Sequence, residues 1–257
     1  MWEIFISNQL YISYIFEILA ALAGLFYLFK SRSPGRDVKL LVYLLVFIFV
    51  YDITALSWGL YGHVYDFKYL EFVNDSPFAS HFWIANAGNI ISVALFSNYF
   101  ALQLASLRRR KFIYILIGLY MLSSVVSFGI GDAFFKTTSP FGYIFGTFII
   151  SLSIGLYYLE LVGTERILRF KTELALYISI GLLVRQLCAT PIFLFQKFIA
   201  ENPEFREVYN YVLDGSNFFM YTMFAAGFII KYLELRKKNN KGGKMQKPVL
   251  DNAKNTL

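Results

Sequence analysis

Residues 174–196 read LALYISIGLLVRQLCATPIFLFQ, a run of 23 residues in which Arg185 is the one charged side chain. As a helix rising ~1.5 Å per residue, the run is roughly 35 Å long, enough to cross a hydrocarbon core of ~30 Å. It therefore predicts a membrane-spanning helix. Arg185 would lie roughly 16 Å into that helix, where an unpaired guanidinium costs at least ~2.5 kcal/mol. Other helices must therefore supply partners for it.

The composition of the whole chain agrees with a membrane protein. Of its 257 residues, 57% are hydrophobic and 19% aromatic, and the apolar residues fall in long blocks. The formal charge of +7 would suggest nucleic-acid binding in a soluble domain, but the basic residues lie between and after the apolar blocks, where they set topology. We therefore expect no nucleic-acid partner. One cysteine and two histidines are too few for an intrachain disulfide, a thiol metal cluster or a histidine metal site.

The apolar blocks predict an all-α, polytopic seven-transmembrane-helix bundle that forms one domain, residues 1–232. The tail that follows, residues 233–257, is polar and lysine-rich and predicts a disordered segment attracted to anionic lipids. The expected spans are about 10–29, 40–62, 81–105, 112–130, 142–162, 174–196 and 208–232.

The basic residues predict the orientation of this bundle. Counted over alternate connections, 19 lysines and arginines fall on one side and 4 on the other, with Arg185 left inside the membrane. Because basic residues collect on the cytoplasmic side, we expect the N-terminus outside and the C-terminus in the cytoplasm. Trp2, Trp58 and Trp83 all fall near predicted outer helix ends, where indole rings prefer the headgroup region.

Three ionisable side chains share one level of the predicted bundle. Glu17 and Asp52 lie ~18 Å from the cytoplasmic ends of their helices, against ~16 Å for Arg185. Charges within a membrane face the bundle interior and pair with one another, so we expect an Arg185–Asp52 ion pair with Glu17 as neighbour or alternative partner. Two carboxyl groups beside one guanidinium leave a surplus negative charge, and Glu17 is the candidate to hold a proton.

Further polar side chains lie slightly farther from the cytoplasmic side. Each set occupies one face of the third or the seventh predicted helix, so together they would line a polar cavity in the outer half of the bundle. The connection 63–80 is long enough to cover that cavity. The candidates are Asn86, Asn89, Asp214, Asn217 and Tyr221.

These residues admit three interpretations: a structural network that joins helices, a ligand pocket, or an ion or proton path. The seventh predicted helix has no lysine before Lys231, which excludes a retinal Schiff base of the photoreceptor kind. No HExxH, GxSxG, P-loop or CxxC motif occurs. We therefore predict no catalytic residue, cofactor or metal.

Several short stretches resemble a broad group of bacterial seven-span inner-membrane proteins of unassigned activity. They are Glu17 with residues 24–28 (GLFYL), residues 178–183 (ISIGLL) followed by Pro191, and Asn217 with Tyr221. The resemblance covers about residues 11–232 and implies the bacterial cytoplasmic membrane. It supplies no catalytic residues.

Three function classes follow from the sequence. The first is a non-enzymatic module that binds a small ligand from the outer side, or a membrane partner, through the outer-half cavity, and relays occupancy to cytoplasmic turns. The second is a secondary or proton-coupled transporter that uses Glu17, Asp52 and Arg185. The third is an enzyme acting on a lipid-borne substrate, with the basic inner turns holding phosphate. The bilayer itself is the partner common to all three.

Overall fold

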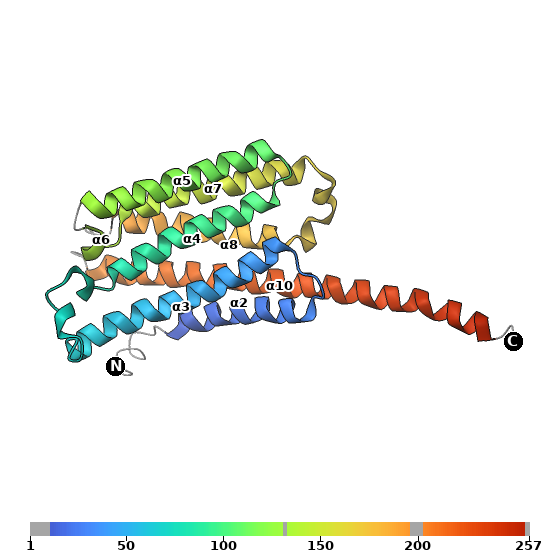
Figure 1. The fold of residues 1–257 in the computed structure, drawn as a ribbon, viewed down its shortest axis with the longest axis horizontal. Helices are drawn as coiled ribbons and strands as arrows, with labels where there is room; N and C mark the ends of the chain where they lie inside the picture. The colour runs from blue at the N-terminus through green and yellow to red at the C-terminus, as the bar shows by residue number, and fades with distance from the viewer. Residues whose placement is uncertain (1–10, 131–132, 196–202, 255–257) are drawn as a thin grey trace.

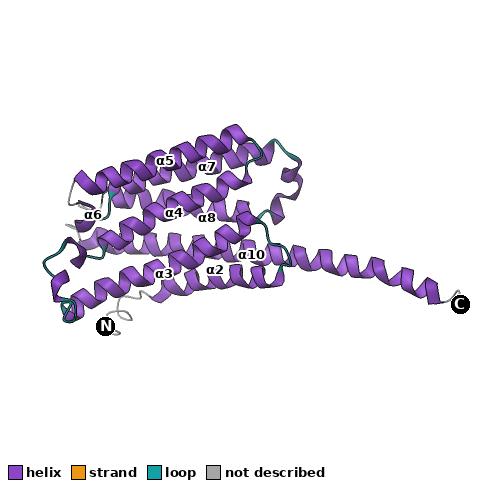
Figure 2. Cartoon of the chain, in the orientation of Figure 1, coloured by secondary structure: helices purple, strands orange, loops and turns teal. Residues whose placement is uncertain are grey.

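The computed structural model describes residues 11–130, 133–195 and 203–254, and all regular secondary structure in those ranges is helical (Figure 2). The all-α prediction is confirmed for that part of the chain. The long helices are α2 (Tyr11–Lys30), α3 (Arg36–Tyr65), α4 (Phe82–Gln103), α5 (Leu107–Ile130), α7 (Pro140–Val162), α8 (Leu174–Leu194) and α10 (Pro203–Lys254). The connections hold α6 (Ala133–Lys136) and the short 3-10 turns η1 (Glu71–Val73), η2 (Pro77–Ala79) and η3 (Glu165–Thr172).

Each predicted span coincides with one of these long helices, within a few residues at most boundaries. Six of them, all except α4, are long and apolar enough to cross a membrane. The chain thus has the make-up of a multi-pass membrane protein. Helix α4 falls outside that group because polar side chains interrupt it at Asn86, Asn89, Ser92, Ser97 and Asn98.

Six long helices form a closed ring in the order α2, α3, α4, α7, α8, α10 and back to α2, with each helix in contact with the next. Helix α5 lies outside the ring and packs on α4 and α7 (Figure 1). The polar helix α4 therefore touches α3, α5 and α7, which shelter its side chains. This shelter is why α4 can be less apolar than its neighbours.

Two glycines allow close approaches that shape the interior of the ring. A Cβ added at Gly88 of α4 would lie 2.4 Å from the ring of Tyr51 on α3, so the glycine makes room for that tyrosine. A Cβ added at Gly181 of α8 would lie 3.0 Å from the backbone oxygen of Met220 on α10. The backbones of α8 and α10 thus approach closely one turn away from Arg185.

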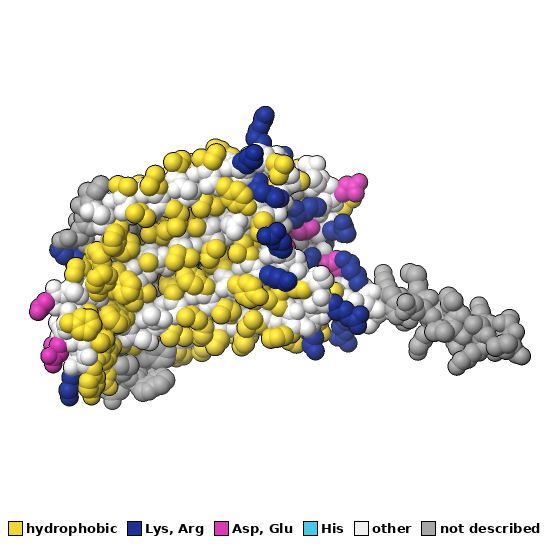
Figure 3. All heavy atoms as spheres, viewed as in Figure 1, with side chains coloured by type: hydrophobic (Ala, Val, Ile, Leu, Met, Phe, Trp, Pro, Cys, Tyr) yellow, Lys and Arg dark blue, Asp and Glu magenta, His cyan; other side chains and the backbone are white. Residues whose placement is uncertain are grey.

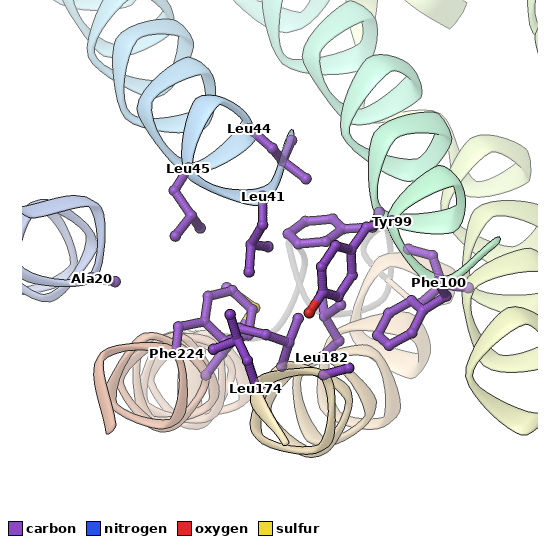
Figure 4. Packing of buried hydrophobic residues seen from close by; sticks show 14 of the residues in the cluster. Ala20, Leu41, Leu44, Leu45, Tyr99, Phe100, Leu174, Leu182 and Phe224 are labelled. Carbon is purple, nitrogen blue, oxygen red and sulfur yellow. The ribbon is translucent and has the colours of Figure 1, made fainter. Parts of the chain in front are cut away.

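Lysine and arginine side chains gather at one end of the bundle, here called the basic end (Figure 3). The half of the ring nearest the basic end is filled by large apolar and aromatic side chains with almost no exposed surface (Figure 4). These residues come from α3, α4, α8 and α10 and form a dry core. They include Leu41, Leu44, Leu45, Tyr99, Phe100, Leu174, Leu182 and Phe224.

Helix α10 continues past the basic end as far as Lys254 and projects away from the bundle (Figure 1). The disordered, lipid-attracted tail from residue 233 stays a prediction; in the structure α10 runs through residues 233–254. Glu234 pairs with Lys231 at 3.5 Å and with Lys238 at 2.8 Å. Such pairs at spacings of three and four residues stabilise the helix where α10 leaves the bundle.

Candidate functional site

A cavity of about 60 Å³ lies inside the ring, at the level of Asp52 and Arg185. Five of the six ring helices contribute to its wall, and apolar side chains from the dry core close it on the side toward the basic end. Its polar lining consists of Tyr51, Asp52, Asn89, Ser92, Tyr143, Arg185, Gln186 and Tyr221.

Arg185 lines this cavity and is held from two helices. Its Nε donates a hydrogen bond to Oδ1 of Asn217 on α10, at 2.9 Å, and its guanidinium is hydrogen-bonded to the Tyr143 hydroxyl on α7. Among the residues that the structure describes, no ion pair within 4.0 Å joins it to an acid. Asp52, which also lines the cavity, and Glu17 interact with it electrostatically. The predicted direct Arg185–Asp52 pair is therefore replaced by neutral partners.

The two acids are paired with each other instead. Glu17 on α2 is only 3% exposed, and its side chain is hydrogen-bonded to that of Asp52 on α3. The Tyr221 hydroxyl donates to Oε1 of Glu17 at 3.2 Å, and Tyr51 is hydrogen-bonded to Asp52. Two carboxyl groups can share a hydrogen bond only when one of them carries a proton. The arrangement therefore agrees with one neutral acid at this position.

Two of the predicted site residues lie elsewhere. Asn86 is buried, but its Nδ2 donates to the backbone oxygens of Phe134 and Thr137, at 2.8 and 2.9 Å, and its Oδ1 accepts from the Ser139 N–H at 3.0 Å. It thereby ties α4 to the connection before α7. Asp214 is exposed and accepts a hydrogen bond from the Ser13 hydroxyl at 3.1 Å. Neither side chain lines the cavity.

Four polar residues that line the cavity were absent from the prediction, namely Tyr51, Ser92, Tyr143 and Gln186. The Thr147 hydroxyl donates to Oε1 of Gln186 at 3.2 Å and lies 2.7 Å from the Thr190 hydroxyl, so α7 and α8 are joined next to the cavity. Tyr143 and Thr147 are four residues apart on one face of α7. That spacing is the sequence signal that could have identified Tyr143 and Thr147. The position of Gln186 directly after Arg185 is the signal that could have identified Gln186.

A second polar cluster lies at the basic end. Arg166 binds both carboxylate oxygens of Glu173, at 3.3 and 3.0 Å, and also donates to the backbone and side-chain oxygens of Gln103, at 3.0 and 3.1 Å. Gln103 in turn donates to Asp37 at 3.0 Å. The hydrogen bond to Glu173 raises the pKa of Arg166 above its ordinary value. This cluster joins α3, α4 and η3: Arg166 pairs with Glu173, and the neutral Gln103 links Arg166 to Asp37.

No family model, curated protein or solved structure was found to match this chain. Among the described residues, no three histidine, cysteine or acidic side chains come together as metal ligands would. The interpretation of the site therefore depends on its own contacts: a guanidinium, a carboxyl pair and a ring of neutral hydrogen-bonding groups around a small cavity.

Proposed function

We propose that the chain crosses the bacterial cytoplasmic membrane seven times, with α4 spanning the membrane in addition to the six more apolar helices. Its 22 residues amount to roughly 33 Å of helix, enough for a hydrocarbon core of ~30 Å. The excess of lysine and arginine supports placing the basic end and the C-terminus in the cytoplasm and the N-terminus outside. Under this topology the cavity belongs to the outer half of the protein.

The function we propose is the binding of a small polar solute that enters from the outer side. The observation that carries this proposal is the position of a polar cavity directly above a dry apolar core. The large side chains of Leu41, Leu45 and Phe224 fill the interior of the ring on that side and are almost fully buried. A site that is polar on one side and sealed on the other is suited to binding, and less suited to a continuous channel.

Asn89 supports access from the outer side. Besides lining the cavity, it lines a smaller void of about 10 Å³ between α4, α5 and α7, together with Ser124, Ser127 and Ser139. A void of that size holds about one water molecule. Polar groups thus continue from the cavity toward the end of the bundle opposite the basic end.

Cysteine accessibility tests this proposal on a single helix. The one native cysteine, Cys188, is replaced by serine, and Ser92→Cys and Ser97→Cys are made separately in that background. Ser92 lines the cavity, whereas Ser97, five residues further along α4, is 0% exposed and lies in the core. Silver ions are added outside sealed right-side-out vesicles, and the thiols left free are then alkylated and detected by intact-protein mass. Silver should block alkylation of the thiol at position 92 and leave the thiol at position 97 open to alkylation.

Protection of that thiol then reports binding. Small solutes of three classes are tested as protectants: formate as anion, methylammonium as cation and urea as neutral molecule. We expect at least one class to slow the modification at position 92. A reactive thiol that no solute protects would refute the binding function, and equal reactivity at positions 92 and 97 would refute the outer cavity.

A proton-coupled transporter is the second candidate, favoured by the Glu17–Asp52 carboxyl pair. It requires the core below the cavity to open during a cycle. In proteoliposomes, it predicts pH-dependent solute uptake that is lost in Glu17→Gln or Asp52→Asn. Uptake equal to that of empty vesicles would exclude transport and leave the binding function standing.

A further inference from the structure

We infer that the solute bound in the cavity is a small monovalent anion, and that it is taken up together with one proton on the Glu17–Asp52 carboxyl pair. The inference rests on the proposed binding function, which it deepens by naming the chemical class of the ligand. Three observations carry it: the hydrogen-bond donors around the cavity, the balance of charge, and the size of the space.

The cavity wall offers more donors than the protein uses. A guanidinium has five N–H donors, and the contacts of Arg185 among the described residues are one bond to Asn217 and one to Tyr143. The side-chain amides of Asn89 and Gln186 also line the cavity. Gln186 uses its oxygen to accept from Thr147, and among the described residues its N–H₂ group donates to no acceptor within hydrogen-bond distance. Such a set suits a ligand that accepts hydrogen bonds.

The charged and titratable groups of the site balance to zero when the carboxyl pair shares one proton. Helix α4 contributes no titratable group to the wall, and its polar lining residues are the neutral Asn89 and Ser92. The Arg185 guanidinium carries one positive charge and the carboxyl pair one negative charge, while the tyrosine hydroxyls are neutral. The titratable groups that interact with one another here are Tyr14 and Glu17 from α2, Tyr51 and Asp52 from α3, Tyr143 from α7, Arg185 from α8, and Tyr209 and Tyr221 from α10.

An anion entering alone would leave this neutral site with a net negative charge in a low-dielectric region, which is costly. If a proton enters with it, an O–H bond forms on the remaining carboxylate oxygen of the pair. Both acids are then neutral, the guanidinium pairs with the anion, and the net charge stays zero. No bond in the anion is broken, and no other reactant is needed.

The size of the cavity limits the anion. A volume of about 60 Å³ corresponds to roughly four water molecules, given the ~15 Å³ that one water needs. Typical pockets for organic ligands measure ~300–1,000 Å³. The ligand class is therefore a monovalent anion of up to about four heavy atoms, of which formate, nitrite and acetate are usable probes.

The decisive measurement is formate binding to the full-length protein in nanodiscs, by calorimetry in two buffers of different ionisation enthalpy. We expect uptake of one proton per formate and an apparent Kd that rises roughly tenfold per pH unit. In the double variant Glu17→Gln/Asp52→Asn, both acids are replaced by neutral amides, so formate should bind without proton uptake and without pH dependence. Arg185→Gln should abolish formate binding.

Asp214→Asn is the matched control, because this acid is exposed and lies outside the cavity, and it should bind formate as the wild type does. Formate binding with no proton uptake in the wild type would overturn the inference even if the double variant fails to fold. Protection of the thiol at position 92 by methylammonium or urea, but not by formate, would overturn the anion class and leave the binding function standing.

Discussion

The close approach of α8 and α10 leads to a quantitative prediction at Gly181. In Gly181→Ala, the new Cβ would lie 3.0 Å from the backbone oxygen of Met220 and 3.2 Å from its Cα. Both atoms belong to the α10 backbone, so the clash cannot be relieved by a side-chain rotation, and the two helices must separate by a few tenths of an ångström. Overpacking of this kind costs ~1–3 kcal/mol.

Alanine also gains ~0.5–1 kcal/mol over glycine inside a helix, which would hide part of this cost. Gly155→Ala is the matched control, because Gly155 lies within α7 and a Cβ there meets no atom within 4 Å. The helix-propensity gain is common to both variants and cancels in their difference. We therefore expect Gly181→Ala to be less stable than Gly155→Ala by ~1–3 kcal/mol.

The free energy of unfolding is measured by reversible titration with a denaturing detergent in mixed micelles. The same variant should weaken formate binding, because separating α8 from α10 moves Arg185 away from Asn217. Equal stability of the two alanine variants would refute the close packing of α8 on α10. Reduced stability with unchanged formate affinity would show that this packing does not position the guanidinium.

Two further predictions concern the partners of the arginines. Asn217→Leu removes the acceptor of the Arg185 Nε hydrogen bond and should lower the free energy of unfolding by ~1.5–3 kcal/mol. The control, Asn210→Leu at an exposed position of α10, should change the free energy of unfolding by less than ~0.5 kcal/mol. Equal effects of the two variants in the same detergent titration would contradict the contact. Arg166→Lys removes the two-oxygen contact with Glu173 and should cost ~1 kcal/mol. Because the pKa of Arg166 is raised in the folded state, its contribution to stability is fully present below the ordinary arginine pKa and is lost only above it. The stability difference between the wild type and Arg166→Lys should therefore not fall when the detergent titration is run at pH 9 instead of pH 7.

The sequence predicts the level of polar groups along each helix well, since counting residues from a helix end measures distance along its axis. Glu17, Asp52 and Arg185 are predicted at one level, with Asn217 and Tyr221 in the set slightly farther from the cytoplasmic side. The structure brings these five side chains into one connected group. The structure also departs from the prediction at Asn86 and Asp214, which face other neighbours. Residue counting cannot separate these cases, because it gives little information on how each helix is rotated toward the others.

The amino-acid sequence by itself determined which long segments are helical and that six of them are apolar enough to span, because length and hydrophobicity are properties of one segment at a time. Tertiary structure alone decided that Arg185 binds Asn217 and Tyr143 while Glu17 pairs with Asp52. The physical reason is that the partner of a side chain depends on helix rotation and spacing. Those are set by close packing between segments distant in the chain, as at Gly181 against Met220.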